Sequence, residues 1–391
     1  MQINLNNINL LYYLNGSNRV NVSKLKLNGT QIWTSPASPV FGISNIGHIT
    51  ASDPRPTLVR TDDSVGKTFS INSNTGEITS DFDGEFPWNQ MTEETDENGN
   101  VFINIPELYI RVTYDGTYID GLAVSNTPRD GGTWIHYSAF KIAKYFSVDP
   151  TNLISKPNKT TNVAFDSFTS YQSLPANYGI LPYYRLLELE ILAIIEYATV
   201  DFKGLINLTT VSVPMPWTTG NSIGKLTPSS FDINKHDLTY HGIESLYYGP
   251  VEVLIGIAIV TSAAYGNASV YIQEPSHYYT NSYDSNIALF YNSSTNKYTY
   301  GTYLSIALMN NGYLYSGSTT LANKTPTTTM TYKGVNGSCF YLHSPAKHPA
   351  EAFSQRGTSA PSGMNYIIYN QKNSSYCTRL IISPDDFPTA P

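Results

Sequence analysis

The chain has 391 residues, 41% of them hydrophobic and 13% aromatic, which suffices for a packed core and for roughly two or three domains. Charged residues make up only 14%, below the roughly 25% of an average globular domain, and the net charge is −7. This balance gives no general attraction toward DNA, RNA or an anionic membrane, so we expect neither a nucleic-acid nor a membrane partner.

Two features bear on the compartment of the protein. Met1–Leu5 lacks the basic and the long apolar regions of a signal peptide, and the longest apolar run, Val251–Val260, is too short to span a bilayer. We therefore expect a soluble protein without a signal peptide.

Cys339 and Cys377 are too few for a disulfide framework or for a zinc site of four sulfurs. We expect two free thiols, with a single bridge between them as the alternative.

Residues 1–34 are predicted to form a small separate unit. The dipeptide Asn28-Gly29 stands between two apolar runs, which is a strong hairpin signal because both central residues of a type I′ turn need a positive φ. The segment 34–39, Thr-Ser-Pro-Ala-Ser-Pro, has the composition of a linker. A unit this small is not stable alone, so we expect it to dock onto another protein. An ordinary first hairpin of the main domain is the alternative to this division into 1–34 and 35–391.

Short strands are predicted in the next part of the chain. Lys67–Asn72 and Gly76–Thr79 form a second candidate hairpin, and Val101–Ile105 and Leu108–Tyr114 have strand character. The oxygen-rich run Asp96–Asn100 lacks the twelfth-position Glu of an EF-hand loop. We predict a turn between strands there and no metal.

One helix is predicted from a proline start. Pro182 stands in the first position, which tolerates proline, and Tyr183–Ala198 contains no glycine and no further proline. Apolar residues cover most of its surface, as in a helix that packs against a sheet. We expect its charged side chains to form a solvated face and not a pair of catalytic acids: Arg185, Glu188, Glu190 and Glu196.

The last third returns to short strands and turns, with candidate strands at Tyr303–Leu308, Asn310–Tyr315 and Met364–Tyr369. Arg379–Ile382 is predicted to be a buried strand that closes the fold. Sheets combined with one main helix and long irregular loops place the chain in the α+β class.

Tyrosine dominates residues 265–316, with eleven tyrosines among 52 residues. Only Glu274, Asp284 and Lys297 carry charge there, and Asn, Ser, Thr and Gly fill most of the gaps. Recognition surfaces favour this composition, because Tyr supplies rigid contact area and Ser, Gly and Asn supply adaptable hydrogen bonds. The alternative is an all-β segment that uses Tyr and Thr because both suit a pleated surface.

Patterns typical of catalysis are missing. The chain has no Gly-x-Ser-x-Gly elbow, no His-Glu-x-x-His pair and no phosphate-binding glycine loop, so we expect no catalytic residues and no cofactor. Gln273–Ser276 contains Glu-Pro-Ser where calcium-dependent lectins have Glu-Pro-Asn, and the serine lacks the metal-binding carbonyl. A local cationic patch offers polar groups for an anionic or hydroxyl-rich ligand, or is an ordinary surface loop: His343, Lys347, His348 and Arg356.

Several segments together resemble phage and prophage tail proteins that carry a C-type-lectin-like domain, of the type found in formylglycine-generating enzymes and retroelement-variable proteins. The resemblance covers roughly residues 40–382, and Phe86–Met91 (Phe-Pro-Trp-Asn-Gln-Met) is its most specific piece. The other matching pieces are Phe41–Ser44, Thr61–Gly66, Asn104–Tyr109, the helix end Glu196–Ala198, His241–Glu252 and Thr378–Leu380. In addition, Leu27–Trp33 is similar to the short anchoring hairpins of tail and baseplate proteins.

The chain departs from this family in places that concern the site. Gly249-Pro250-Val251-Glu252 stands where the family often has Gly-Asn-x-Trp-Glu, and the acidic residue often found near Gly256 is absent. The oxidase branch uses a close cysteine pair for copper, whereas Cys339 and Cys377 are far apart, which argues against that activity. In the diversified branch, the ligand-facing residues are late in the chain and are often Tyr, Asn or Ser.

The resemblance implies a virion protein, and not an enzyme, whose residues 1–34 bind other virion proteins. A small N-terminal β-hairpin anchor would precede a C-type-lectin-like domain of short antiparallel strands, and this domain would bind a host surface glycan or protein receptor. A trimer would suit fibre-like attachment, although no coiled-coil heptads support one. The predicted ligand-binding residues are Tyr341, His343, Arg356, Tyr366, Tyr369 and Asn370, flanked by Tyr278, Tyr279 and Tyr283.

Two alternatives stay open. The first is a purely structural or decorating component of the head or baseplate. The second is a tail-borne glycan depolymerase, which needs two carboxyl groups about 5 Å apart or somewhat more, and Glu244 and Glu252 are its nearest candidates.

Overall fold

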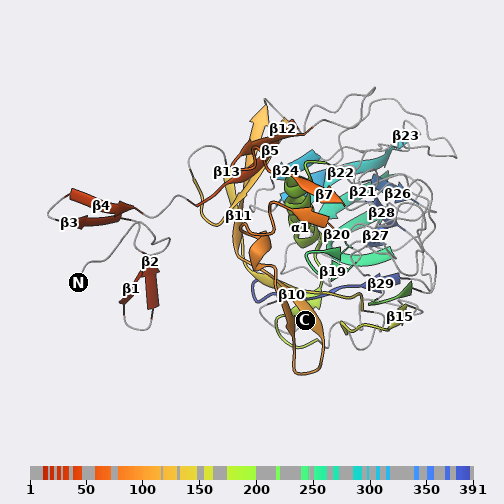
Figure 1. Cartoon of the computed structure of the whole chain (residues 1–391). Coiled ribbons are helices and arrows are strands. Elements are labelled where there is room, and N and C mark those ends of the chain that lie inside the picture. The colour runs from red at the N-terminus through yellow and green to blue at the C-terminus, as the bar shows by residue number, and fades with distance from the viewer. Residues whose placement is uncertain are drawn as a thin grey trace. The chain divides into compact units, whose positions relative to one another are not determined.

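Figure 1 shows a computed structural model in which the chain divides into two compact units, Met1–Pro39 and Val40–Pro391. In 12–34 and in most of 251–377 the structure describes the backbone and its pairing alone. The described residues are 12–15, 18–21, 24–27, 30–34, 38–45, 58–71, 78–115, 118–129, 133–147, 154–161, 174–199, 217–220, 239–244, 246, 251–261, 267–272, 285–292, 297–298, 305–308, 314–317, 339–342, 350–355, 366–369 and 376–387.

The first unit contains two antiparallel strand pairs. β1 (Tyr12–Asn15) pairs with β2 (Asn18–Asn21), and β3 (Lys24–Leu27) pairs with β4 (Thr30–Thr34). Leu27 lies opposite Thr30, so two residues join β3 to β4. The hairpin predicted at Asn28-Gly29 is confirmed, and the apolar run before it is divided between β2 and β3.

One five-stranded antiparallel sheet of the second unit has the order β13-β11-β12-β5-β6. Its core positions are apolar, and Gly121 is required where β12 passes β5, because a Cβ there would lie 2.9 Å from the carbonyl oxygen of Ile43. The predicted strand at 108–114 is confirmed. The bounds are β5 (Phe41–Ser44), β6 (Val59–Asp62), β11 (Leu108–Asp115), β12 (Tyr118–Ser125) and β13 (Thr133–Tyr137).

A second five-stranded antiparallel sheet has the order β16-β30-β14-β10-β9. The predicted turn at 96–100 joins β9 to β10, where Asp96 Oδ1 accepts hydrogen bonds from the backbone N–H groups of Asn98 (2.9 Å) and Asn100 (2.7 Å). The closing strand predicted at the end of the chain is confirmed, with Ile381 fully buried. The bounds are β9 (Glu93–Thr95), β10 (Val101–Ile105), β14 (Phe140–Ala143), β16 (Tyr178–Ile180) and β30 (Leu380–Ile382).

An eight-stranded sheet has the order β23-β22-β21-β20-β27-β28-β26, with β29 pairing with β20. Its neighbouring strands are antiparallel except for two parallel pairs, β20 with β29 and β26 with β28. The bounds are β20 (Val251–Thr261), β21 (Asn267–Ile272), β22 (Ser285–Asn292), β23 (Lys297–Tyr298), β26 (Cys339–Leu342), β27 (Ala350–Gln355), β28 (Tyr366–Tyr369) and β29 (Tyr376–Thr378).

Among the described residues, the second unit also contains four two-stranded antiparallel pairs and a short 3-10 turn at Trp88–Gln90. The hairpin predicted within 67–79 is confirmed as β7 with β8. The pairs are β7 (Phe69–Ile71) with β8 (Ile78–Ser80), β15 (Thr160–Thr161) with β17 (Trp217–Thr218), β18 (Thr239–Tyr240) with β19 (Ile243–Glu244), and β24 (Ser305–Leu308) with β25 (Leu314–Gly317).

The predicted helix is confirmed as α1 (Tyr183–Tyr197), which follows Pro182 and ends where Ala198 adopts a left-handed φ of 50°. The prediction of a solvated face on this helix is wrong. Arg185, Glu188, Glu190 and Glu196 are at most 1% exposed. The reason is that α1 contacts β5 and β12 of one sheet and β20 of another, so that it lies between two sheets (Figure 1).

The predicted α+β class is also wrong. The described part of the chain consists mostly of antiparallel β-sheets with a single helix, and is therefore β-rich. In an α+β domain the helices are segregated onto one face or end of a sheet, whereas α1 lies among strands of different sheets. The helices that the structure describes include none with the length and apolar character that a membrane crossing requires.

Burial forces the charged residues of α1 to pair inside the protein. The Arg185 guanidinium donates to Glu188 Oε2 (3.0 Å), to Asp386 Oδ2 (3.0 Å) and to the backbone carbonyl of Ser138 (2.9 Å). It also lies 4.5 Å from the centre of the Phe140 ring. Two carboxyl groups share one guanidinium here, and burial raises the pKa of Glu188 to about 7 and that of Asp386 to about 8.

These shifts predict that stability falls as the pH rises. The folded protein holds the Glu188 proton to a higher pH than the unfolded chain, whose usual value is 4.5, so this contribution is complete below pH 4.5 and lost toward about pH 7. Asp386 acts in the same direction up to about pH 8. Glu188→Gln removes one of the two titrations and should flatten the decline by on the order of 3 kcal/mol. Urea unfolding between pH 4.5 and 8 measures it.

The matched control is Glu97→Gln, at an exposed carboxyl in the turn between β9 and β10. It should leave the pH dependence of the free energy of unfolding as in the wild type. A Glu188→Gln variant that keeps the full decline would contradict the assignment.

Candidate functional site

The structure places three of the predicted ligand-binding residues on two paired strands. Tyr341 lies on β26, and Tyr366 and Tyr369 lie on β28. These strands are parallel neighbours, with Tyr341 opposite Ile368. The remaining six predicted residues lie outside the described part of the chain: Tyr278, Tyr279, Tyr283, His343, Arg356 and Asn370.

The tyrosine-rich stretch and the late strands share one sheet. β21, β22 and β23 come from the stretch 265–316, and they stand in the same eight-stranded sheet as β26 and β28. Three strand spacings separate β21 from β28, which is about 14 Å at the usual spacing of about 4.8 Å. The tyrosine-rich stretch and the late strands are therefore parts of one sheet, with β20 and β27 between β21 and β28.

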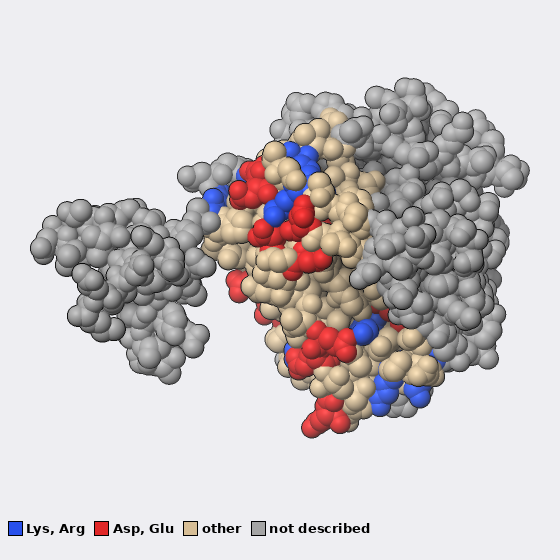
Figure 2. All heavy atoms as spheres, in the orientation of Figure 1, with Lys and Arg blue, Asp and Glu red and all other residues tan. Residues whose placement is uncertain are grey.

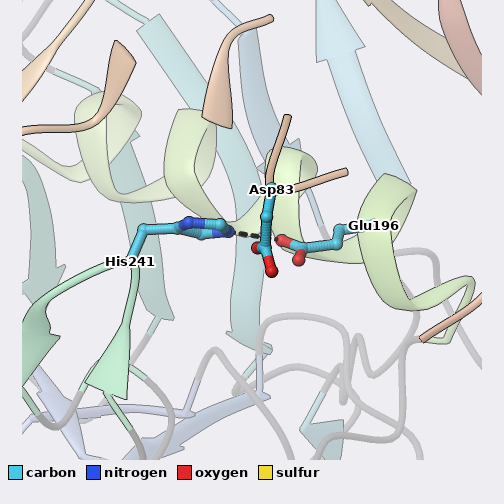
Figure 3. Close-up of side chains that lie close together, drawn as sticks. All are labelled: Asp83, Glu196 and His241. Carbon is cyan, nitrogen blue, oxygen red and sulfur yellow. Dashed lines mark hydrogen bonds and ion pairs between the residues drawn. The ribbon is translucent and has the colours of Figure 1, made fainter. Parts of the chain in front are cut away.

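A second polar group lies at the end of α1 and was not predicted. Asp83, Glu196 and His241 each offer one ligand atom, and these atoms lie within 4.8 Å of one another. Figure 3 shows the three side chains pointing toward a common point. The His241 Nε2 atom lies 2.9 Å from Glu196 Oε2. Glu196 is buried, His241 is half-buried and Asp83 is exposed, so the group extends from the core to the surface.

A tight turn fixes the position of His241. Tyr240 and Ile243 are paired across β18 and β19, so His241 and Gly242 form a two-residue loop, and both have a positive φ, of 42° and 88°. Two positive φ values are typical of a type I′ turn, in which a non-glycine residue costs about 1 kcal/mol. Gly242 packs closely against Ile103 of β10, because a Cβ at position 242 would lie 2.8 Å from Ile103 Cδ1.

Asp83 is held by a turn that has an aromatic anchor. Its Oδ2 atom accepts from the backbone N–H of Ser80 (3.2 Å). The neighbouring Phe82 is fully buried and packs edge-on against Phe41 and Trp88, with ring centres 5.5 and 4.7 Å apart. The exposed carboxylate therefore projects from a loop that the core holds in place.

Arg60 caps the end of the helix next to Glu196. Its two terminal nitrogens donate to the carbonyl oxygens of Ile195 (2.8 Å) and Glu196 (2.6 Å), which satisfies carbonyls that a helix end leaves unpaired. Burial lowers the pKa of Arg60, while the charges of Glu196 and Asp81 oppose that shift. The Arg60 guanidinium also lies 5.0 Å from the centre of the Phe82 ring.

Tyr240 completes the surroundings of Glu196. Its hydroxyl accepts a hydrogen bond from Trp88 Nε1 at 2.9 Å. Burial, followed by the charge of Glu196, raises the pKa of the Tyr240 phenol well above its usual value, so the phenol stays neutral. Tyr240 is thus an aromatic, uncharged neighbour of the carboxylate–imidazole pair, in addition to the Arg60 guanidinium.

The residue types of this group are those that bind metal ions. Two carboxylates and one imidazole form a mixed oxygen and nitrogen ligand set. The group was not predicted from the sequence, because the three residues are far apart in the chain and Glu196 was assigned to a solvated face. One signal was available: a glutamate in the last turn of a helix whose surface is almost entirely apolar.

The depolymerase alternative named Glu244 and Glu252. Glu244 is 1% exposed, its Oε2 atom accepts from the backbone N–H of Gly220 (2.8 Å), and its carbonyl oxygen accepts from Arg379 (2.8 Å). These bonds tie Glu244 to structural contacts of the backbone. The side chain of Glu252 lies outside the described residues.

No family model matches the chain, and no curated protein matches it significantly. The resemblance to phage tail proteins therefore stays a prediction from the segments that carry it.

The cap formed by Arg60 predicts a specific loss of stability. Arg60→Lys keeps the positive charge, but a lysine ammonium cannot reproduce the two hydrogen bonds that the planar guanidinium donates to neighbouring carbonyls. We therefore expect a loss of about 1–2 kcal/mol in the free energy of unfolding. Urea denaturation measures this loss. Arg111→Lys is the matched control, because the ion pair of Arg111 is a single bond from one nitrogen to Asp62, which an ammonium can replace. Equal losses in both variants would contradict the role of the cap.

Proposed function

We propose that this chain is a phage virion protein that binds a ligand on the host cell surface through its eight-stranded sheet. The observation that carries the proposal is the tyrosine-rich, charge-poor stretch 265–316, whose strands β21, β22 and β23 belong to the same sheet as the late strands β26 and β28. Tyrosine-rich and weakly charged surfaces favour binding over catalysis. The ligand would be a glycan or a protein receptor.

Binding would follow from the chemistry of these side chains. Tyrosine rings stack on the apolar faces of sugars or press against a protein, and Asn, Ser and backbone groups hydrogen-bond hydroxyls. Each contact of this kind is modest. Repeated copies on a particle would multiply a weak interaction by avidity, because binding of the first copy raises the effective concentration of the others.

The first unit would attach the chain to the particle, a role separate from the proposed binding of the host ligand. Residues 1–39 form their own compact unit with two hairpins, and the predicted anchor 1–34 lies within it. A unit of this size is too small to be stable alone, which suits a segment that docks onto another virion protein. Deleting it should remove the chain from particles and leave cell binding by the remainder unchanged.

Replacing two tyrosines of the predicted site tests the proposal. Tyr278→Ala/Tyr279→Ala in the full chain should weaken binding to host cells roughly thirtyfold or more, because each buried tyrosine in a binding site contributes about 1–2 kcal/mol. The melting temperature should stay within a few degrees of the wild type. Titration of fluorescently labelled protein on candidate host cells gives the affinity.

The matched control is Tyr109→Ala/Tyr145→Ala. Both tyrosines are half-buried in the part of the second unit formed by residues 40–147, where the ring of Tyr109 lies 4.9 Å from that of His136. This variant should keep its affinity for cells. Equal loss of melting temperature and of binding in the 278/279 variant would contradict the assignment, and release of reducing sugar from host envelopes by the wild type would favour the depolymerase.

A further inference from the structure

Three chain segments bring metal-ligand atoms together at the end of α1 (Figure 3). Asp83 comes from the turn after β8, Glu196 from the last turn of the helix, and His241 from the turn between β18 and β19. We propose that Asp83, Glu196 and His241 bind one divalent transition-metal ion of the Zn²⁺ class. This site is independent of the proposed attachment function, since none of its residues lies in the eight-stranded sheet.

The distances fit such an ion after a small movement. Zinc lies about 2.0–2.2 Å from imidazole nitrogen and carboxylate oxygen, so ligand atoms around it are about 3.4 Å apart in a tetrahedron. The separation between His241 Nε2 and Glu196 Oε2 is 2.9 Å, and every separation in the group is at most 4.8 Å. To hold the ion, His241 and Glu196 would move apart from their hydrogen-bonded separation, and Asp83, the member nearest solvent, would move toward them.

The donor atoms select the class of ion. Calcium and magnesium take oxygen ligands almost exclusively, whereas zinc and its neighbours in the first transition row accept imidazole nitrogen together with carboxylate oxygen. Two carboxylates balance the charge of a divalent cation. Three protein ligands leave the fourth position of a tetrahedral ion to water, and the exposed Asp83 side of the group gives water access.

Among the described residues, Asp83 and Glu196 form no side-chain salt bridge with a lysine or arginine. Figure 2 shows acidic residues gathered on the visible face of the second unit, with Lys and Arg beside several of them. Four other acids have such a partner: Glu85 with Lys67, Asp62 with Arg111, Glu94 with Lys141 and Glu93 with Lys144. The Arg60 guanidinium acts on Glu196 through its charge, but its two terminal nitrogens donate to backbone carbonyls.

The turn between β18 and β19 sets the direction of the His241 side chain. His241 adopts a φ of 42°, in the left-handed region where Asn, Asp and His are enriched among non-glycine residues. This turn aims the imidazole at the buried Glu196 carboxylate.

Another histidine–glutamate pair shows what distinguishes the site. His136 Nε2 lies 2.9 Å from Glu107 Oε1, the same separation as in the pair of His241 with Glu196. Both of its side chains are exposed, at 51% and 59%, and no third ligand joins them among the described residues. His136 is therefore a matched control for a surface histidine.

Zinc titration of the full chain, purified in the presence of a chelator and then dialysed, tests the proposal. Isothermal calorimetry with ZnCl₂ should show one saturable site per chain that is stronger than any other, and zinc should raise the melting temperature by a few degrees. CaCl₂ should produce neither effect. His241→Asn keeps a residue that tolerates positive φ, and it should weaken zinc binding at least tenfold.

Asp83→Asn removes the exposed ligand without touching the core and should also weaken binding at least tenfold. His136→Asn should bind zinc as the wild type does. Circular dichroism checks that each variant is folded, and Asp83→Asn decides the question if His241→Asn does not fold. Zinc binding that is absent in the folded wild type, or unchanged in both site variants, would overturn the proposal, and so would calcium binding of equal strength.

Discussion

The rest of the structure depends on the complete burial of α1. The helix contacts strands of two different sheets, so no side of it faces water and each of its charged residues is at most 1% exposed. A buried charge without a partner is strongly unfavourable. Arg185 therefore pairs with Glu188 on the helix itself and with Asp386 near the C-terminal end of the described residues.

This constraint organises the polar chemistry of the second unit. At one end of α1, Arg185 joins the helix to Asp386 and to the backbone of Ser138. At the other end, Arg60 caps the last carbonyls and Glu196 meets His241. The helix thereby gathers carboxylates and an imidazole from distant segments into one place, while the tyrosine-rich strands form a separate sheet. The polar contacts that hold the second unit together and the proposed ligand recognition thus fall on different parts of the fold.

Local signals in the sequence predicted local structure well. Asn28-Gly29 correctly predicted a hairpin, because these residues tolerate the positive φ values of a tight turn. Pro182 correctly predicted the start of the helix, because the first turn of a helix does not need the N–H that proline lacks. Both effects are local in the chain. Burial of Glu188 and Glu196 was not predictable in this way, since it depends on sheets built from residues far along the chain. The same holds for the group of Asp83, Glu196 and His241, and for the β-rich class, which pairing between distant strands decides. The recognition residues stay a prediction, because most lie outside the described residues.

The central claim is that this protein attaches a phage to its host, and a competition experiment tests it most directly. Purified full-length chain would be mixed with candidate host cells before virus is added, and the adsorption rate of the virus would be measured. The account predicts saturable binding to the cells and a matching, dose-dependent block of adsorption. A folded protein that binds no cells and leaves adsorption unchanged would contradict the account and indicate a purely structural role in the particle.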